Sequence, residues 1–160
     1  MRARQAGEGG YVEDLFENAL VSAGLSGVDR RLCQELVYGV VRWRAALGWL
    51  AARKTAGRTQ KAGLEILLQL GLYQMFWLDR IPPHAAVNET VELARRMGFG
   101  PQSGFLNAVL RGYSREAAAT RCLLAELKET EPAVGWSHPA WMVDGWEQAF
   151  GRGATRDLLA

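Results

Sequence analysis

Residues 70–98 read LGLYQMFWLDRIPPHAAVNETVELARRMG, and this stretch decides the fold. Its first part continues a segment that is apolar nearly all round, which predicts a central, buried helix over about 61–78. Pro82 and Pro83 stop that helix and prepare the next one, because proline cannot continue a helix but is well placed in a first helical turn. A second helix is expected over about 84–97. The stretch therefore predicts two consecutive helices joined by a short connection.

The polar residues at the start of the second helix raise the question of catalysis. His84, Asn88 and Glu89 could belong to a catalytic cluster or to half of a metal site. A catalytic role needs a base or metal beside them, and the sequence offers neither. We therefore interpret Asn88 and Glu89 as residues that hold this helix in place, and His84 as a residue of the helix junction. No catalytic residue is predicted in this chain.

The rest of the chain shows helical periodicity without the alternation typical of strands. The predicted fold class is all-α, a compact bundle of about seven helices. One long helix is expected from Asp29 to about Arg53, and Gly39 and Gly48 inside it mark possible points of close helix contact. Further helices are expected at 11–23, from 101 and from 137 onward, and 115–129 is either a continuation of the helix that starts at 101 or a separate helix. Gly151 and Gly153 close the helix that starts at 137, and a further helix starts near the end. Residues 55–60 are a basic loop and 131–136 a connector.

Length and composition limit the classes of protein. A chain of 160 residues suits one domain with a full core. Two cysteines, without a CxxC pair, argue against a disulfide framework or a structural zinc site, so no metal is expected. No apolar run reaches the length of a membrane span, and the first twenty residues do not resemble a signal peptide. We expect a cytoplasmic protein with no membrane partner.

The charge distribution is more informative than the net charge of +2. No acidic residue lies between Glu35 and Glu65 or between Glu92 and Glu116. Local positive fields attract polyanions even when the net charge is small. The residues predicted to contact RNA phosphates are Arg42, Arg44, Arg53, Lys54, Arg58 and Lys61, followed by Arg95, Arg96 and Arg111. The alternative is that the two windows are ordinary solvated basic faces.

A second pattern combines arginines with aromatic residues. On one continuous helix, Arg31, Tyr38, Arg42, Trp49 and Arg53 would fall on roughly the same face. Arginines could contact phosphates while the aromatic rings stack on unpaired bases. The rings could equally pack under a neighbouring helix, and the sequence leaves both interpretations open.

Three segments resemble a known family: LVYGVVRWRAALGWL at 36–50, the stretch at 70–98, and GFLNAVLRGYSR at 104–115. They are similar to the NusB-like RNA-binding fold. This fold occurs as the free antitermination factor NusB and as the N-terminal domain of bacterial ribosomal RNA cytosine-5 methyltransferases, the Sun/RsmB or Fmu family. The resemblance covers roughly 11–160. SHPAWMVDGWEQAFG at 137–151 looks like the segment that leads into the methyltransferase domain, which favours the second branch.

The resemblance implies that 1–135 form an RNA-binding domain and that 136–160 begin the linker helices to a methyltransferase domain absent from these residues. The module would position small-subunit ribosomal RNA for methylation by that domain. The expected partners are ribosomal RNA and the chain's own C-terminal methyltransferase domain. No cofactor is expected in this chain, whereas S-adenosylmethionine is expected for the full-length parent. The basic N-terminal segment of NusB proteins is represented only by Arg2 and Arg4.

Two alternatives remain open at this point. The first is a stand-alone NusB-type transcription antitermination factor that binds RNA with a ribosomal protein. The second is a protein-interaction domain that does not contact RNA. Residues encoded after Ala160 would distinguish the methyltransferase module from the antitermination factor, and crosslinking of RNA to this chain would separate both from the protein-interaction domain.

Overall fold

The computed structural model describes residues 12–58 and 60–160, so Arg2 and Arg4 lie outside the described residues. The described residues belong to two compact units, with the boundary between Tyr38 and Gly39. The first unit contains α1 (Val12–Ala23) and most of α2 (Gly27–Arg42). Phe16 is buried on α1, and its ring lies against that of Tyr38 with centroids 5.7 Å apart. An aromatic contact between the two helices therefore contributes to this small unit.

The start of α2 is fixed by a short polar turn. The Ser26 hydroxyl accepts a hydrogen bond from the Asp29 backbone N–H at 3.2 Å and donates one to the Asp29 carboxylate at 2.6 Å. Such a bond satisfies one of the backbone donors that a helix leaves unpaired at its N-terminus. The expected position of Asp29 at the start of the second helix is confirmed.

The secondary structure described in the second unit is all helical. It contains α3 (Arg44–Thr55), α4 (Ala62–Trp77), α5 (Pro83–Arg96), the 3-10 turn η1 (Gly100–Gln102), α6 (Ser103–Arg115), α7 (Ala117–Thr130), α8 (Pro132–Gly135) and α9 (Ala140–Leu159). Residues 12–58 and 60–160 thus form nine α-helices and no strand, which confirms the all-α class. The predicted division at 135/136 remains a prediction, since 39–160 cluster as one unit.

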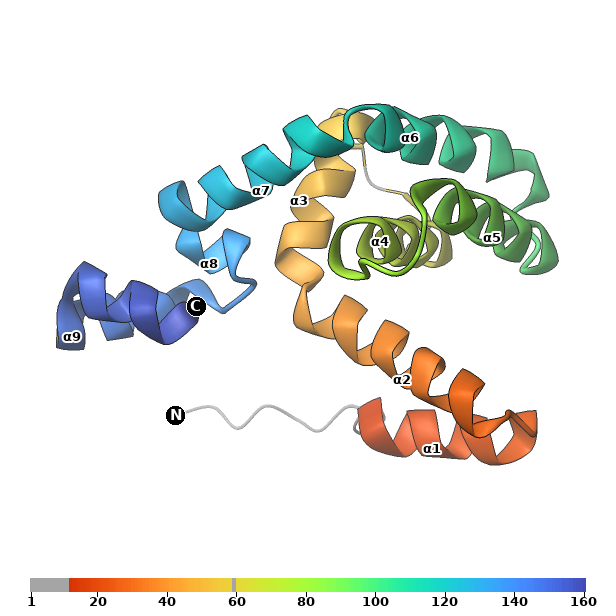
Figure 1. The fold of residues 1–160 in the computed structure, drawn as a ribbon, viewed down its shortest axis with the longest axis horizontal. Helices are drawn as coiled ribbons and strands as arrows, with labels where there is room; N and C mark the ends of the chain where they lie inside the picture. The colour runs from red at the N-terminus through yellow and green to blue at the C-terminus, as the bar shows by residue number, and fades with distance from the viewer. Residues whose placement is uncertain (1–11, 59) are drawn as a thin grey trace. The chain divides into compact units, whose positions relative to one another are not determined.

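The core of the second unit surrounds α4, as the continuous apolar pattern predicted. Helix α4 contacts α3, α5 and α6, and Figure 1 shows it between α3 and α5. Gly71 is required at one of these contacts, because a Cβ there would lie 2.8 Å from the Leu110 side chain of α6. The buried α4 side chains include Leu64, Leu67, Leu68, Leu72, Tyr73, Met75 and Phe76.

The boundaries of α5 follow the predicted signals closely. Pro82 precedes the helix and Pro83 is its first residue. At the other end, Gly98 has φ +84°, the left-handed conformation that glycine adopts readily. The Gly98 N–H donates to the Arg95 carbonyl and the Phe99 N–H to the Ala94 carbonyl, which together form a Schellman motif. Gly98 therefore ends α5 as predicted.

The single long helix expected over 29–53 is wrong. Helix α2 ends at Arg42, Trp43 has φ −101° and ψ 20°, and α3 begins at Arg44. The break lets the Trp43 ring lie 5.2 Å from that of Trp77, so tertiary packing overrides the local period. The predicted aromatic and basic face from Arg31 to Arg53 depended on that continuous helix and does not form. This break and the short α8 raise the helix number above the predicted seven.

The two glycines that marked possible close contacts behave differently. The Tyr73 ring of α4 lies directly against Gly39, where a Cβ would overlap it, so this expectation is confirmed. Nothing lies within 4 Å of the position that a Cβ on Gly48 would take. Gly48 therefore marks no helix contact.

The last helices are held to the start of α3 by contacts between distant residues. The Ser137 hydroxyl accepts a hydrogen bond from the Ala46 N–H at 2.9 Å, and Ser137 adopts φ +53°. The connector expected at 131–136 contains the short helix α8, and Gly151, at φ +79°, kinks α9 where the sequence predicted its end. None of the described helices combines the length and apolar character that crossing a membrane requires.

Candidate nucleic-acid interface

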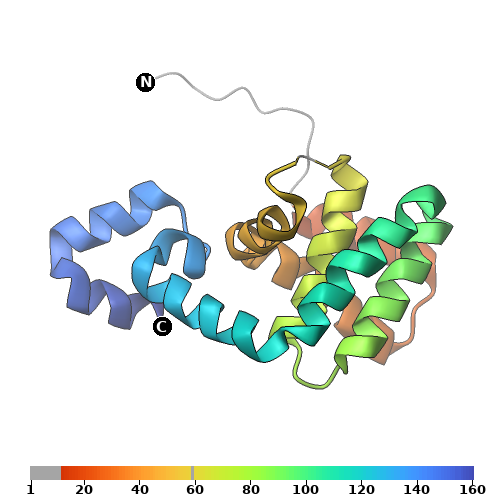
Figure 2. The same cartoon turned by 90° about the horizontal axis from the view of Figure 1, so that it is seen from above.

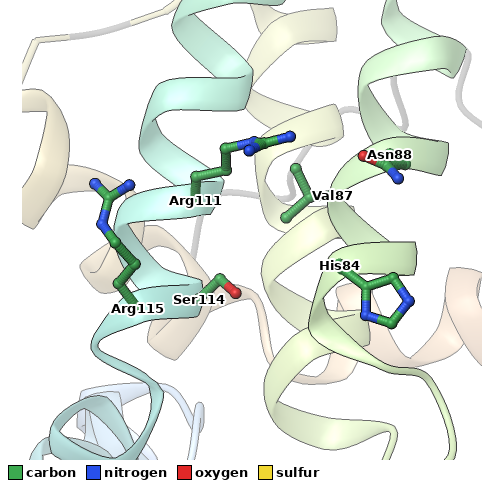
Figure 3. Close-up of a pocket in the computed structure, with 6 residues that line it drawn as sticks. All are labelled: His84, Val87, Asn88, Arg111, Ser114 and Arg115. Atoms are coloured by element: carbon green, nitrogen blue, oxygen red, sulfur yellow. The ribbon is translucent and has the colours of Figure 1, made fainter.

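A groove between α5 and α6 contains the first candidate site. One pocket in it has a volume of about 300 Å³ and is lined by His84, Val87, Asn88, Arg111, Ser114 and Arg115. Figure 3 shows the first three on α5 and the others on α6, with the Arg111 side chain extending toward α5. Figure 2 shows the two helices side by side, and they are in direct contact. Hydrogen-bonding side chains from both helices thus line one pocket.

The groove continues along the same two helices. A second hollow of about 470 Å³ shares Asn88 and Arg111 with the first and also includes Arg95 and Asn107. The Arg111 Nε donates to the Asn107 side-chain oxygen at 2.9 Å, which leaves the terminal nitrogens of its guanidinium available. The structure therefore brings together two residues predicted from different parts of the same acid-free window, Arg95 and Arg111.

The interpretation of Asn88 and Glu89 as residues that hold α5 in place is wrong. Both side chains are exposed, and neither hydrogen-bonds to another residue in the described part of the chain. The polar group that fixes this helix is Thr90, whose buried hydroxyl donates to the Ala86 carbonyl at 2.7 Å and accepts from the Gln74 amide at 3.4 Å. Asn88 lies two residues away from Thr90 and lines the groove instead.

The second candidate site surrounds the loop between α3 and α4, which we call the α3–α4 corner. Two hollows of about 550 and 140 Å³ lie beside it and share Thr55, Arg58 and Gln60. The larger one also includes Lys54 and, from α6, Phe105. Lys54 and Arg58, both predicted RNA contacts, thus line the same hollow. The corner combines cations, an amide and an aromatic ring.

Several of the predicted cations lack an ion pair in the part of the chain that the structure describes. Arg44, Arg58 and Lys61 are exposed and form no ion pair with any acid that the structure describes. Arg53 lies over the Trp49 ring, with 4.9 Å between the guanidinium carbon and the ring centroid. These charges are therefore not neutralised within the described fold, as a phosphate-binding surface requires.

Lys54 is already paired within the fold. Its ammonium lies 2.7 Å from the Glu116 carboxylate, and this hydrogen bond and charge lower the pKa of Glu116. Both groups are at the surface, where such a pair contributes little stability. Lys54 can exchange this partner for a phosphate at small cost.

Arg42 has a structural role that the sequence did not indicate. Its guanidinium donates to the Trp136 carbonyl at 2.7 Å and lies 3.2 Å from His138 Nε2. Burial and the neighbouring Arg42 charge lower the pKa of His138. These contacts connect the end of α2 to the start of α9. Of the nine predicted residues, Arg42 is the one whose guanidinium bonds residues more than ninety positions away in the chain.

Arg95 and Arg96 share one acidic partner. Their guanidinium nitrogens lie 3.5 and 3.2 Å from the Glu92 carboxylate on the preceding turn of α5. One carboxylate cannot neutralise two arginines, so this end of α5 keeps a positive charge. The pairs are exposed and of the ordinary helix-surface kind.

Sequence reasoning missed several residues of these sites. Phe105 was not predicted as a site residue, but it is exposed at the corner, although Leu106 next to it is fully buried. Its place in the helical period, about 90° from the centre of the Leu106, Val109 and Leu110 face, could have indicated this. Ser114 and Arg115 complete the α5–α6 pocket, and the acid-free window around Arg115 was the available signal.

Residues that could hold a metal ion are dispersed. In 12–58 and 60–160, no three histidine, cysteine, aspartate or glutamate side chains are grouped as metal ligands would be. Cys33 and Cys122 are free thiols. The two candidate sites consist of arginine, lysine and amide groups, which are donors suited to anions.

The described residues thus form an all-α module with two basic, amide-lined surfaces. Comparison with known families is consistent with this description. A model described as the NusB family matches residues 2–115, and the chain therefore belongs to the NusB family. The family expected from the sequence is confirmed.

The relatives point to one branch of the family. The chain is 37% identical over 153 residues to a probable ribosomal RNA small subunit methyltransferase B from Synechocystis, covering 94% of this chain and 34% of that protein. It is 43% identical over 124 residues to ribosomal RNA small subunit methyltransferase B from Pseudomonas syringae, covering 76% of this chain and 27% of that protein. A probable methyltransferase B from Bacillus subtilis is 34% identical over 143 residues, with coverage of 88% and 32%. The chain thus spans about a third of the length of these relatives.

Proposed function

We propose that this chain is the RNA-binding module of a ribosomal RNA cytosine-5 methyltransferase and positions small-subunit ribosomal RNA for a methyltransferase domain elsewhere in the full-length protein. Its membership of the NusB family and the names of its relatives support this proposal. The module itself would bind RNA in the cytoplasm and carry out no chemistry. The methyltransferase names of the relatives favour this function over a stand-alone antitermination factor.

The observation that carries the proposal is the set of unneutralised cations around the α3–α4 corner. Arg53, Arg58 and Lys61 are exposed and have no ion pair in the described fold. A protein surface that needed only solubility would mix acidic and basic residues. The stretch between Glu35 and Glu65 contains basic residues but no acidic residue. Phosphate groups are the anions that such a surface fits best, because each bound phosphate releases condensed counterions from the RNA.

The expected cofactor of the full-length protein does not fit the sites in this chain. S-adenosylmethionine carries a sulfonium and an ammonium against a single carboxylate, so its net charge is positive, and the charges of Arg111 and Arg115 in the α5–α6 pocket disfavour a net cation. The corner is likewise lined by Lys54 and Arg58. We therefore assign S-adenosylmethionine and the catalytic step to the methyltransferase domain of the full-length protein.

The same proposal gives the chain a second partner, its own methyltransferase domain. Helix α9 exposes three large apolar side chains, Trp141, Phe150 and Leu158. Exposed apolar groups of this size are common where another domain packs. Their position in 136–160, the expected linker region, supports a role in contacting that domain.

The proposal predicts that the cations of the α3–α4 corner contribute to the salt dependence of RNA binding. The double variant Arg58→Ala/Lys61→Ala should weaken binding of a single-stranded ribosomal RNA fragment and reduce the slope of log K against log salt by about 1.4, since each single-strand phosphate contact contributes about 0.7. Fluorescence anisotropy at four or more salt concentrations measures this slope. Neither side chain takes part in the fold's ion pairs, so stability should be unchanged.

The matched control is Arg152→Ala/Arg156→Ala on α9, which also removes two exposed positive charges. This variant should keep the slope of the unaltered protein. Equal slopes for the corner and control variants would refute the corner as the RNA contact. Absence of any RNA binding by the unaltered chain would favour the protein-interaction hypothesis instead.

A further inference from the structure

The segment that joins α8 to α9, residues 135–138, has a strained backbone; we call it the strap. Ser137 adopts φ +53°, a left-handed conformation that residues other than glycine rarely take. Such a conformation persists only where surrounding contacts hold it in place. The contacts that hold the strap therefore indicate what it is for.

The first contact joins the strap to the beginning of α3. The Ser137 hydroxyl accepts a hydrogen bond from the N–H of Ala46, the third residue of that helix. This N–H is one of the donors that a helix leaves unpaired at its N-terminus, and Trp43, just before α3, provides no side-chain cap. The strap thus caps α3 from 91 positions away.

The second contact comes from Arg42, at the end of α2. Its guanidinium donates to the Trp136 carbonyl and also lies 3.2 Å from His138 Nε2, so it holds the strap on both sides of Ser137. A planar guanidinium can bond two such groups at once. A lysine side chain has the same charge but lacks this fork, so it cannot reproduce the pair of contacts.

Packing immobilises the strap further. The Trp136 ring lies 6.5 Å from that of Trp43, and the Lys128 ammonium of α7 lies 4.0 Å from its centroid. Gly135 packs so closely on α7 that a Cβ there would lie 2.5 Å from the Lys128 backbone nitrogen. The strap is therefore fixed against both α3 and α7.

Helix α3 connects the strap to the α3–α4 corner. It has twelve residues and is about 18 Å long at 1.5 Å per residue. Ala46, near its first end, bonds the strap, whereas Lys54 and Thr55, at its last turn, line the corner. One rigid helix thus sets the distance between the corner and the start of α9.

We infer that Arg42 is a positioning residue for methylation: by holding the strap it fixes the direction of α9, and thereby places the methyltransferase domain relative to RNA bound at the corner. The inference rests on the proposed function and adds the means by which the two domains are aligned. Arg42 then acts on turnover and not on RNA affinity. Misplacement of reacting groups by about 1 Å can cost about a hundredfold in rate.

The test uses the full-length protein with unmodified small-subunit ribosomal RNA and tritiated S-adenosylmethionine. Arg42→Lys keeps the positive charge and removes the two-point contact, and Ser137→Ala removes the cap on Ala46. The matched control is Arg80→Lys, because Arg80 is exposed, forms no ion pair with the described residues and lies outside both candidate sites. Urea unfolding verifies that each variant is folded.

Arg42→Lys should lower kcat at least tenfold while KM for RNA stays within twofold, because the charge that a phosphate would contact is retained. Ser137→Ala should change kcat in the same direction. In the 160-residue chain, hydrogen exchange of α8 and the first turns of α9 should become faster in both variants. Arg80→Lys should match the unaltered protein in every measurement.

Two results would overturn the positioning role and leave the proposed function intact. One is a kcat of Arg42→Lys within twofold of the unaltered protein. The other is a raised KM for RNA with an unaltered kcat, which would make Arg42 an RNA contact. If the unaltered full-length protein transferred no methyl group to RNA, the proposed function itself would fail, and the positioning role with it.

Discussion

At the scale of single residues, Tyr113 shows how a buried polar atom joins two helices. Its ring is buried on α6, and its hydroxyl donates to the Leu50 carbonyl of α3 at 2.6 Å. The Lys54 ammonium lies 5.2 Å from the ring centroid. Burial raises the pKa of Tyr113 to about 12, although the positive charge of Arg53 acts in the opposite direction. The neutral phenol is therefore the form that the fold stabilises.

This gives a prediction for pH. The folded pKa of Tyr113 is higher than the unfolded value of 10.0, so its contribution to stability is complete below pH 10 and is lost as the pH rises toward 12. Spectrophotometric titration at 295 nm should show a step near pH 12 whose amplitude falls by one tyrosine in Tyr113→Phe. The same variant should lower the free energy of unfolding by about 1–2 kcal/mol, measured in urea, because the Leu50 carbonyl loses its donor. A late step of undiminished amplitude in Tyr113→Phe would refute the assignment.

At the scale of helices, two glycines differ in whether a neighbouring helix packs against them. Gly71 on α4 faces Leu110 of α6 and Thr90 of α5, with 2.8 and 3.2 Å from its virtual Cβ to their side chains. Gly48 on α3 has open space around the same point. Both are inside helices, so the sequence pattern does not distinguish them.

The two positions should respond oppositely to alanine. Gly48→Ala should stabilise the fold by about 0.5–1 kcal/mol, the ordinary helix-propensity gain. Gly71→Ala should destabilise it by about 1–2 kcal/mol, because Leu110 is fully buried and overpacking exceeds that gain. Urea midpoints of the two variants decide this. Stabilisation by both would show that α4 and α6 can separate without cost.

At the scale of the whole molecule, the contacts of Arg42 join parts of the second unit that are far apart in sequence. Its guanidinium reaches Trp136 and His138, 94 and 96 positions away. The His138 ring also meets Trp146 of α9 edge-on, with centroids 5.6 Å apart. The neutral His138 must accept at Nε2 to bond Arg42, and protonation removes that acceptor.

Stability should therefore fall in mild acid. Burial and Arg42 lower the folded pKa of His138 below its usual 6.5, so protonation of this residue favours the unfolded chain as the pH drops below that value. The free energy of unfolding, measured in urea at pH 7.5 and 5.5, should decrease. His138→Gln keeps an acceptor without a titrating group and should show a smaller decrease. Identical pH profiles for both proteins would contradict this role.

The sequence by itself determined the helical class, the buried α4, the boundaries of α5 and the family. These features depend on the period of apolar residues and on prolines and Gly98, whose effects act within a few residues. It also located the acid-free windows that contain most of the cations.

Only the tertiary structure decided which of those residues form a site. The break at Trp43, the exposed Asn88 and the internal contacts of Arg42 all depend on partners distant in sequence. Phe105 lines the same hollow as Arg58 and Gln60, and this depends on α3 and α6 both packing on α4. The local period fixes which face of a helix is apolar, but the neighbour that this face meets is set by packing of the whole chain.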